Sequence, residues 1–185
     1  MGPLPIIVAV VLLLLAVYVV VNYNRFVAVR AHLRESWSDI DVELKRRYEL
    51  VPNLVETVKG YAAHERAVLE EVTRLRDRAA QPHGSAAMQA VDESALAIGV
   101  EKLLAVAEAY PDLKADTHFL ALQRELALTE DRIAAARRFY NGNVRDLNEL
   151  CQAFPTNLIA GLFGFERADY FDAGEQARLA PKVGL

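Results

Sequence analysis

The chain has 185 residues, a formal net charge of −4, and acidic and basic residues interleaved along most of its length. This length fits one folded domain together with a membrane element. Nucleic-acid binding calls for a basic face or a basic run, so the charge argues against a nucleic-acid partner. Cys151 is the only cysteine, which excludes an intramolecular disulfide. Few glycines and prolines, with many Ala, Leu, Glu and Arg, favour an all-α domain.

The N-terminus carries an apolar segment of membrane length. Residues 4–21, LPIIVAVVLLLLAVYVVV, contain no charged side chain, and a bilayer core needs about 20 predominantly apolar residues. A cleaved signal peptide is the main alternative, but it requires a basic n-region and a small-residue cleavage site that are absent here. We therefore predict an uncleaved anchor at residues 1–21 that contacts the lipid bilayer, with Leu4, Ile6, Leu14 and Val21 among its membrane residues.

Charge around this segment predicts its orientation. No Lys or Arg precedes the span, whereas Arg25, Arg30 and Arg34 follow it closely. By the positive-inside rule, the short N-terminus lies outside and the large domain lies in the cytoplasm. The sequence thus predicts a single-pass protein of the cell membrane.

The first soluble segment has helical periodicity but contains a proline. An apolar stripe runs through residues 22–50, with Ser36 placed on the solvent side. At Pro52 one helical hydrogen bond is lost, so the helix either kinks there or ends there. Asn53 is the candidate for satisfying the backbone groups that the break exposes. The stripe comprises Phe26, Leu33, Trp37, Ile40 and Leu44.

Three further helices are predicted. The second ends near Ala79, before a loop at 81–85, and the third covers residues 86–109. Gly99 weakens the third helix by roughly 1 kcal/mol relative to alanine unless a neighbouring helix uses the space. A break at 110–113 is followed by Asp116, a candidate N-cap for a last helix at 117–154.

The last helix has the longest apolar stripe, which is typical of bundle or coiled-coil packing. We therefore predict an all-α fold, with a transmembrane helix followed by an antiparallel bundle of four long helices over residues 22–165. Residues 166–185 form a C-terminal tail with a polar, frayed end. The stripe comprises Phe119, Leu122, Leu126, Thr129, Ile133, Ala136, Tyr140, Val144, Leu147, Cys151 and Phe154.

Four stretches together resemble one known family. They are WSDIDVELKRRYELVPNLVETVKGYAAHE at 37–65, LLAVAEAYPDLKAD at 103–116, ARRFYNGNVRDLNE at 136–149 and FPTNLIAGLFGF at 154–165. The chain is similar in these stretches to the LemA family of bacterial single-pass membrane proteins. The resemblance implies an N-terminal membrane helix followed by long antiparallel helices, and it implies neither a defined activity nor catalytic residues. Gly142 departs from the family pattern and is expected to loosen its helix locally.

No catalytic, metal or cofactor site is predicted. His64 and Glu65 begin like a zinc-peptidase motif, but position 68 is Val, which favours a surface polar pair. Cys151 lies on an apolar stripe, which favours a buried side chain over a reactive thiol. An enzyme would need a buried, water-accessible cluster of titratable residues, and an entirely apolar core would exclude one.

Lys45, Arg46 and Arg47 are candidates for binding anionic headgroups or an acidic partner. They lie ~35 Å from the span along a straight helix, so headgroup contact requires a bend. A solvated bundle face, partly paired with Glu43 and Glu49, is the favoured interpretation.

A second candidate surface lies near the C-terminus, around Asn157, Phe163 and Phe165. It either docks a partner or covers the end of the bundle core. The predicted function is a membrane-anchored, non-enzymatic helical scaffold or interaction module with a protein partner. The alternative is an accessory subunit that modulates a membrane enzyme or protease.

Overall fold

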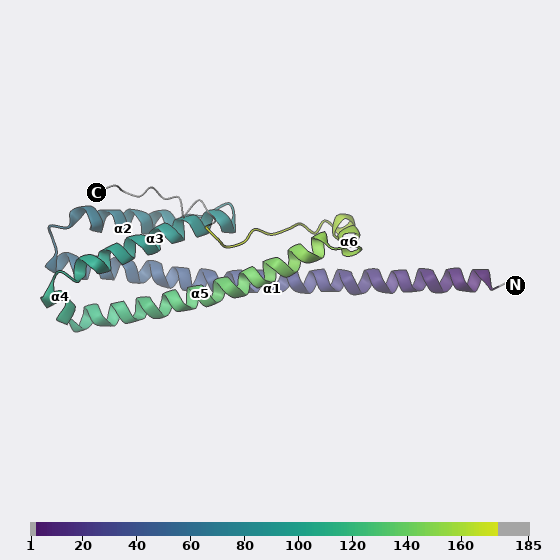
Figure 1. The fold of residues 1–185 in the computed structure, drawn as a ribbon, viewed down its shortest axis with the longest axis horizontal. Coiled ribbons are helices and arrows are strands. Elements are labelled where there is room, and N and C mark those ends of the chain that lie inside the picture. The colour runs from purple at the N-terminus through teal and green to yellow at the C-terminus, as the bar shows by residue number, and fades with distance from the viewer. Residues whose placement is uncertain (1–2, 174–185) are drawn as a thin grey trace. The chain divides into compact units, whose positions relative to one another are not determined.

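The structure is a computed structural model that describes residues 3–173, and every regular element in this range is a helix (Figure 1). The all-α fold with a long N-terminal apolar helix is therefore confirmed. Besides four longer helices, the described residues contain two short ones, α4 and α6, that the sequence did not predict. The helices are α1 (Leu4–Tyr61), α2 (Arg66–Ala79), α3 (Ala86–Ala107), α4 (Pro111–Ala115), α5 (Thr117–Gln152) and α6 (Thr156–Phe163).

The described residues form two compact units. Unit 1 contains residues 3–37 and 139–168, and unit 2 contains residues 38–138 and 169–173. Helices α1 and α5 both contribute to each unit.

Helix α1 continues through its proline. Because Pro52 has no N–H, the Tyr48 carbonyl loses the donor that it would otherwise have one turn later. The Nε of Arg76, on α2, donates to this carbonyl at 3.1 Å instead. The alternative in which the helix ends at Pro52 is thus wrong, since α1 ends at Tyr61. The role predicted for Asn53 is filled by Arg76.

The core of unit 2 is made by α1, α2, α3 and α5 with the short α4. Helices α2 and α3 are joined by residues 80–85 and pack closely at Gly99. A Cβ there would lie 2.7 Å from Cδ1 of Leu75 and 3.6 Å from Cγ2 of Val72, so a neighbouring helix does use the space. The most buried apolar residues include Val51, Leu54, Val58, Val72, Leu96, Leu103 and Leu113.

Two of the helical glycines, Gly99 and Gly142, should respond differently to alanine. A Cβ at Gly142, in α5, would meet no neighbouring atom within 4 Å, so Gly142→Ala should stabilise the protein by about 1 kcal/mol through helix propensity. At Gly99 the same methyl must displace Leu75, which offsets that gain. Urea unfolding of both variants measures the difference. Equal stabilisation at the two positions would show that Leu75 moves aside freely.

Unit 1 has a separate, smaller core between α1, the end of α5 and α6. Helix α6 ends at Gly164, whose φ of 68° is a left-handed conformation that glycine adopts without strain. The hydroxyl of Thr156 lies 2.7 Å from the Leu150 carbonyl, which ties the start of α6 to the end of α5. The core residues are Phe26, Leu147, Leu150, Ile159, Ala160 and Phe165.

Three local predictions were wrong. Ser36 is fully buried rather than solvent-facing, and its hydroxyl accepts a hydrogen bond from Asn143 at 3.1 Å. Phe154 lies beyond the end of α5 and is 81% exposed, so the apolar stripe does not reach it. Residues 166–173 of the tail are not frayed, because Phe171 is buried and the backbone of Ala168 exchanges two hydrogen bonds with the Asn148 side chain. Residues 174–185 lie outside the described range.

Candidate functional site

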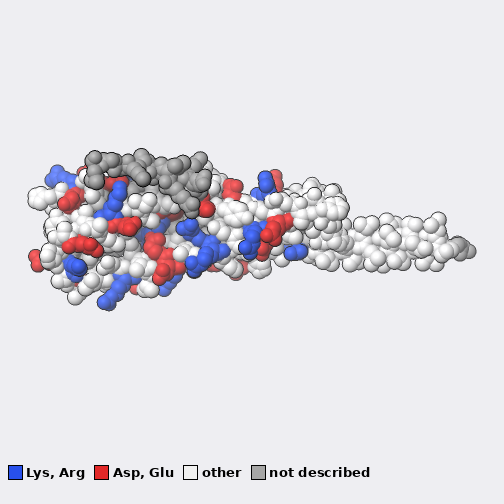
Figure 2. Space-filling model, in the orientation of Figure 1, with Lys and Arg blue, Asp and Glu red and all other residues white. Residues whose placement is uncertain are grey.

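The apolar start of α1 is uncovered by the rest of the described chain. Its best 18-residue window has a mean hydropathy of 3.2 and no buried residue, so α1 is long and apolar enough to cross a membrane. Leu4, Ile6, Leu14 and Val21 are each more than half exposed. Figure 2 shows this segment free of charged side chains, whereas both signs of charge are intermixed elsewhere on the visible face.

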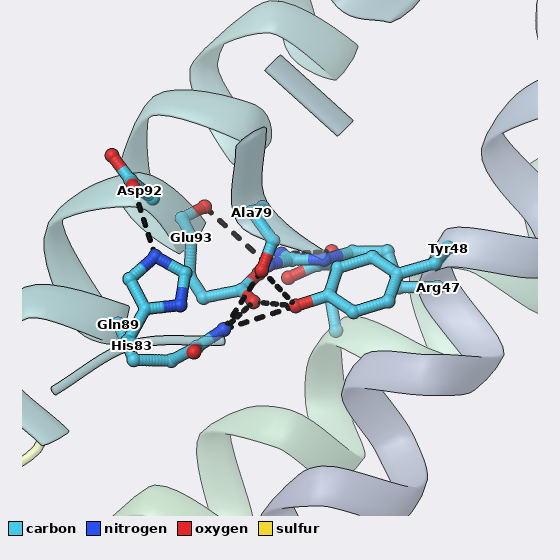
Figure 3. Close-up of polar contacts among 8 residues, drawn as sticks. Arg47, Tyr48, Ala79, His83, Gln89, Asp92 and Glu93 are labelled. Atoms are coloured by element: carbon cyan, nitrogen blue, oxygen red, sulfur yellow. Dashed lines mark hydrogen bonds and ion pairs between the residues drawn. The ribbon is translucent and has the colours of Figure 1, made fainter. Parts of the chain in front are cut away.

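A charged side chain lies in the middle of unit 2. Arg47, on α1, is only 2% exposed and forms ion pairs with two carboxylates (Figure 3). Its Nη2 contacts Glu93 of α3, which is itself buried, and its Nη1 donates to Oε1 of Glu130 of α5 at 2.8 Å. Burial lowers the pKa of Arg47, but the Glu130 and Glu93 carboxylates raise it by more, so its pKa lies above its ordinary value. One buried cation thus joins three helices.

The same cluster satisfies the end of α2. The Ala79 carbonyl is in the last turn of α2 and has no intrahelical partner there. The Tyr48 hydroxyl lies 2.9 Å from it, and Nε2 of Gln89 lies 3.0 Å from it. Both side chains also bond the Glu93 carboxylate, Gln89 at 2.6 Å. The cluster therefore neutralises Arg47 and caps a helix with one set of side chains.

Tyr48 should make stability fall at alkaline pH. Burial, and then its bond to Glu93, raise the pKa of the Tyr48 phenol above its ordinary value of about 10. Above pH ~10 the unfolded chain releases this proton while the folded protein keeps it, so stability decreases as pH rises. Below pH ~10 both states hold the proton and the contribution is constant.

Urea unfolding between pH 8 and pH ~11 measures this loss, and the Tyr48→Phe variant is the control because it has no proton to release at this site. The wild-type protein should lose more stability over this range than the variant. Equal losses would show that other groups cause the alkaline sensitivity.

His83 and Asp92 form a second buried pair next to the cluster. Nε2 of His83 lies 2.8 Å from Oδ2 of Asp92, and Arg78 contacts the other carboxylate oxygen at 2.6 Å. An imidazole held by a carboxylate is the arrangement that orients a general base. Within residues 3–173, however, Nδ1 of His83 is buried without a hydrogen-bond partner, so no nucleophile is hydrogen-bonded to it. The pair therefore attaches the loop at 80–85 to α3.

Unit 2 does not have an entirely apolar core, so the condition that would exclude an enzyme is not met. Across the described residues, no group of three His, Cys, Asp or Glu side chains is placed to hold a metal ion. Cys151 is partly buried, its thiol donates to the Phe165 carbonyl at 3.8 Å, and burial raises its pKa. A raised pKa keeps the thiol protonated and weakly nucleophilic.

A groove of about 640 Å³ runs along α1 and α2 in unit 2. Val55 and Leu69 contribute apolar side chains to it, and charged side chains of both signs surround them. A second hollow of about 300 Å³ has Val51, Pro52 and Val55 in its lining, so the two lie along the same stretch of α1. The charged residues of the larger groove are Lys59, Arg66, Glu70, Arg74 and Asp77.

The basic triplet does not form one solvated face. Lys45 is exposed and bonds Asp41 one turn earlier, and Arg46 is 43% exposed and pairs with a carboxylate of α5. Arg47 points into the core, so the predicted solvated face is wrong at this residue. The partners also differ from the predicted Glu43 and Glu49: they are Asp41, Glu125, Glu93 and Glu130.

The residues of the second predicted surface differ in burial: one lies in the core and two lie on the exterior. Phe165 is 8% exposed and stacks on Phe26 with ring centroids 4.5 Å apart, so it covers the core of unit 1. Phe163 is about half exposed and meets Tyr23 edge to face at 4.9 Å. Asn157 is exposed. Phe165 therefore covers the core, as one of the two alternatives predicted. Phe163 and Asn157 remain accessible to a partner.

Sequence reasoning missed the buried cluster and the groove. One signal for the cluster was present, because Asp92 and Glu93 interrupt an otherwise apolar stretch of α3. The groove had no local signal, since Val55 and Leu69 continue the same apolar stripe as the core residues.

Comparisons with known proteins relate this chain to one family and to several named relatives. The sequence model of the LemA family matches residues 36–184. The chain is 26% identical to magnetosome protein MamQ 2 of Paramagnetospirillum magneticum, with 88% of this chain and 70% of the relative covered. It is 24% identical to magnetosome protein MamQ of Magnetospirillum gryphiswaldense, with 98% and 78% covered. It is 25% identical to protein LemA of Metamycoplasma hominis, with 84% and 71% covered. Because the family match covers most of its length, this membrane-associated helical protein belongs to the LemA family.

Proposed function

We propose that this protein is a single-pass membrane scaffold whose helical domain binds a protein partner in the cytoplasm and catalyses no reaction. The uncovered apolar start of α1 supports the anchor, and the basic residues that follow it support a cytoplasmic domain. The observation that carries the binding role is the groove along α1 and α2.

The groove has the features of a site for an amphipathic helix. Its 640 Å³ is within the range of known binding clefts. Val55 and Leu69 provide apolar contacts, and Lys59 and Glu70 are among the charges around them. Helix-in-groove recognition places apolar anchors on such a floor and uses the surrounding charges to fix register and partner choice.

The buried polar groups support a non-enzymatic role. Arg47, Tyr48 and Gln89 all bond the Glu93 carboxylate, and Tyr48 and Gln89 also reach the carbonyl at the end of α2. Side chains committed to one another in this way hold helices in register. A reacting substrate would have to displace these bonds.

Photocrosslinking in native membranes tests the proposal. A photoreactive side chain replaces Lys59 in the groove or, as a matched control, Asp131, which is exposed on α5 outside the groove. We expect a discrete crosslinked protein from position 59 only, and its loss when Val55→Asp puts a charge in the groove. Crosslinks of equal yield from both positions would contradict groove recognition. A stoichiometric enzyme at position 59 would instead identify an accessory subunit of that enzyme.

Orientation has its own test. Protease added to intact spheroplasts should leave the domain uncut if it lies in the cytoplasm. Digestion of the domain would place it outside and overturn the positive-inside assignment.

A further inference from the structure

Unit 1 contains a cleft whose lining combines cations with aromatic rings. The cleft has a volume of about 300 Å³ and lies between α1 and the chain at and after α6, which run beside each other in Figure 1. Helix α1 contributes Arg30 and Arg34, one turn apart, and Tyr23. Phe163 and Phe165 complete the aromatic part of the lining. All five residues belong to the same compact unit.

The two guanidinium groups are available to an anion. Arg30 lies over the Phe165 ring, 4.9 Å from its centroid, and both arginines are exposed. In the part of the chain that the structure describes, neither arginine pairs with a carboxylate. Two free guanidinium groups in one cleft suit a phosphate, whose oxygens accept their paired N–H groups.

Helix α6 presents an apolar face beside this cleft. It has no charged residue, and Ile159 and Ala160 face the core while Leu158 and Leu162 are 63% and 73% exposed. At the end of α6 the Phe163 ring contacts Tyr23, which lies just beyond the apolar segment of α1. Apolar side chains exposed beside a membrane span gain free energy when acyl chains remove them from water.

The position along α1 agrees with a headgroup site. Taking ~1.5 Å per residue, Tyr23 lies about 3 Å and Arg30 about 13 Å beyond Val21, the last residue of the apolar run. Side chains on a helix lean toward its N-terminus, which on α1 is the membrane side. Long arginine side chains therefore bring their charge toward the headgroups. Insertion of the exposed face of α6 would draw the cleft closer still.

We propose that this cleft binds the phosphate of an anionic phospholipid, with α6 lying in the adjoining lipid interface. The proposal rests on the membrane anchoring proposed above. A bilayer lipid, rather than free phosphate, is the occupant because Leu158 and Leu162 of α6 expose apolar side chains close to the end of the span, where acyl chains can cover them.

Lipid-selective fluorescence quenching tests this site in the full chain. Trp37→Phe removes the only tryptophan, and Phe163→Trp places a reporter in the cleft. The protein is reconstituted in vesicles of equal parts phosphatidylcholine and phosphatidylglycerol, with brominated acyl chains on one lipid or the other. Phosphatidylglycerol should quench severalfold more than phosphatidylcholine, because the two cations attract the anionic lipid.

Two double variants that remove the same number of charges test whether the lipid preference arises in the cleft. Arg30→Gln with Arg34→Gln should bring the quenching ratio to one, whereas Arg25→Gln with Arg145→Gln, outside the cleft lining, should leave most of the preference. A ratio of one in the starting protein, or a ratio unaffected by the cleft variant, would overturn the proposal. Added inorganic phosphate should lower the ratio no more than sodium chloride of equal ionic strength. Abolition by phosphate alone would identify a free-phosphate site instead.

Extraction of the same vesicles at alkaline pH separates this proposal from the anchor on which it rests. Protein that stays inserted but shows no lipid preference contradicts only the headgroup site. Protein that is released contradicts the anchor itself.

Discussion

Replacing Arg47 with methionine is expected to lower the free energy of unfolding by about 3–5 kcal/mol, because it leaves the buried Glu93 carboxylate without its cation. A methionine fills similar space, so loss of charge rather than loss of volume dominates the effect. Chemical denaturation followed by circular dichroism measures it.

Two further variants show whether the buried charge causes the loss of stability in Arg47→Met. Arg46→Met removes the half-exposed pair with Glu125 and should cost less than about 1 kcal/mol. Arg47→Met combined with Glu93→Gln removes both buried charges and should recover part of the loss, because the amide still accepts a hydrogen bond from Tyr48. A loss below ~1 kcal/mol for Arg47→Met alone would mean that the Glu93 site takes up water or a proton.

Replacing Phe165 with alanine is expected to release α6 without unfolding unit 2. The ring is 8% exposed and contacts Phe26 and Tyr23, so its loss should cost about 3–5 kcal/mol within unit 1. Amide hydrogen exchange in α6 should then accelerate by roughly 10²–10⁴-fold. Mass spectrometry of exchanged peptides resolves α6 from the other helices.

The control for this variant is Phe163→Ala. This ring is about half exposed and makes one edge contact with Tyr23, so the acceleration in α6 should be much smaller. Faster exchange in α2 and α3 for Phe165→Ala would contradict a local effect and show that the two cores unfold together.

The helical fold could be predicted because its signal is local. Apolar residues three or four positions apart identified α1, α2, α3 and most of α5, and a side-chain acceptor followed by a helical pattern identified Asp116, whose carboxylate accepts from the Phe119 and His118 backbone amides. The positions at which helices end were harder to predict from the sequence. Whether a helix survives Pro52 depends on a donor from another helix, and no local pattern shows that donor.

The buried cluster could not be predicted for a related reason. Arg47 is followed directly by another polar residue and preceded by two bases, a pattern typical of a solvated face. Its partners lie 46 and 83 residues away in the chain, so only tertiary packing brings the charges together. The cleft in unit 1 has the same origin, since its arginines and its phenylalanines come from opposite ends of the sequence.

The proline in α1 has a consequence for how this sequence can change over time. While Pro52 is present, Arg76 supplies the donor for the Tyr48 carbonyl, so loss of Arg76 leaves that carbonyl without its partner. Once Pro52 becomes alanine, the new amide can bond the same carbonyl and Arg76 becomes dispensable there. The two positions are therefore epistatic. An evolutionary path that replaces the proline first is open, whereas the reverse order passes through a less stable intermediate.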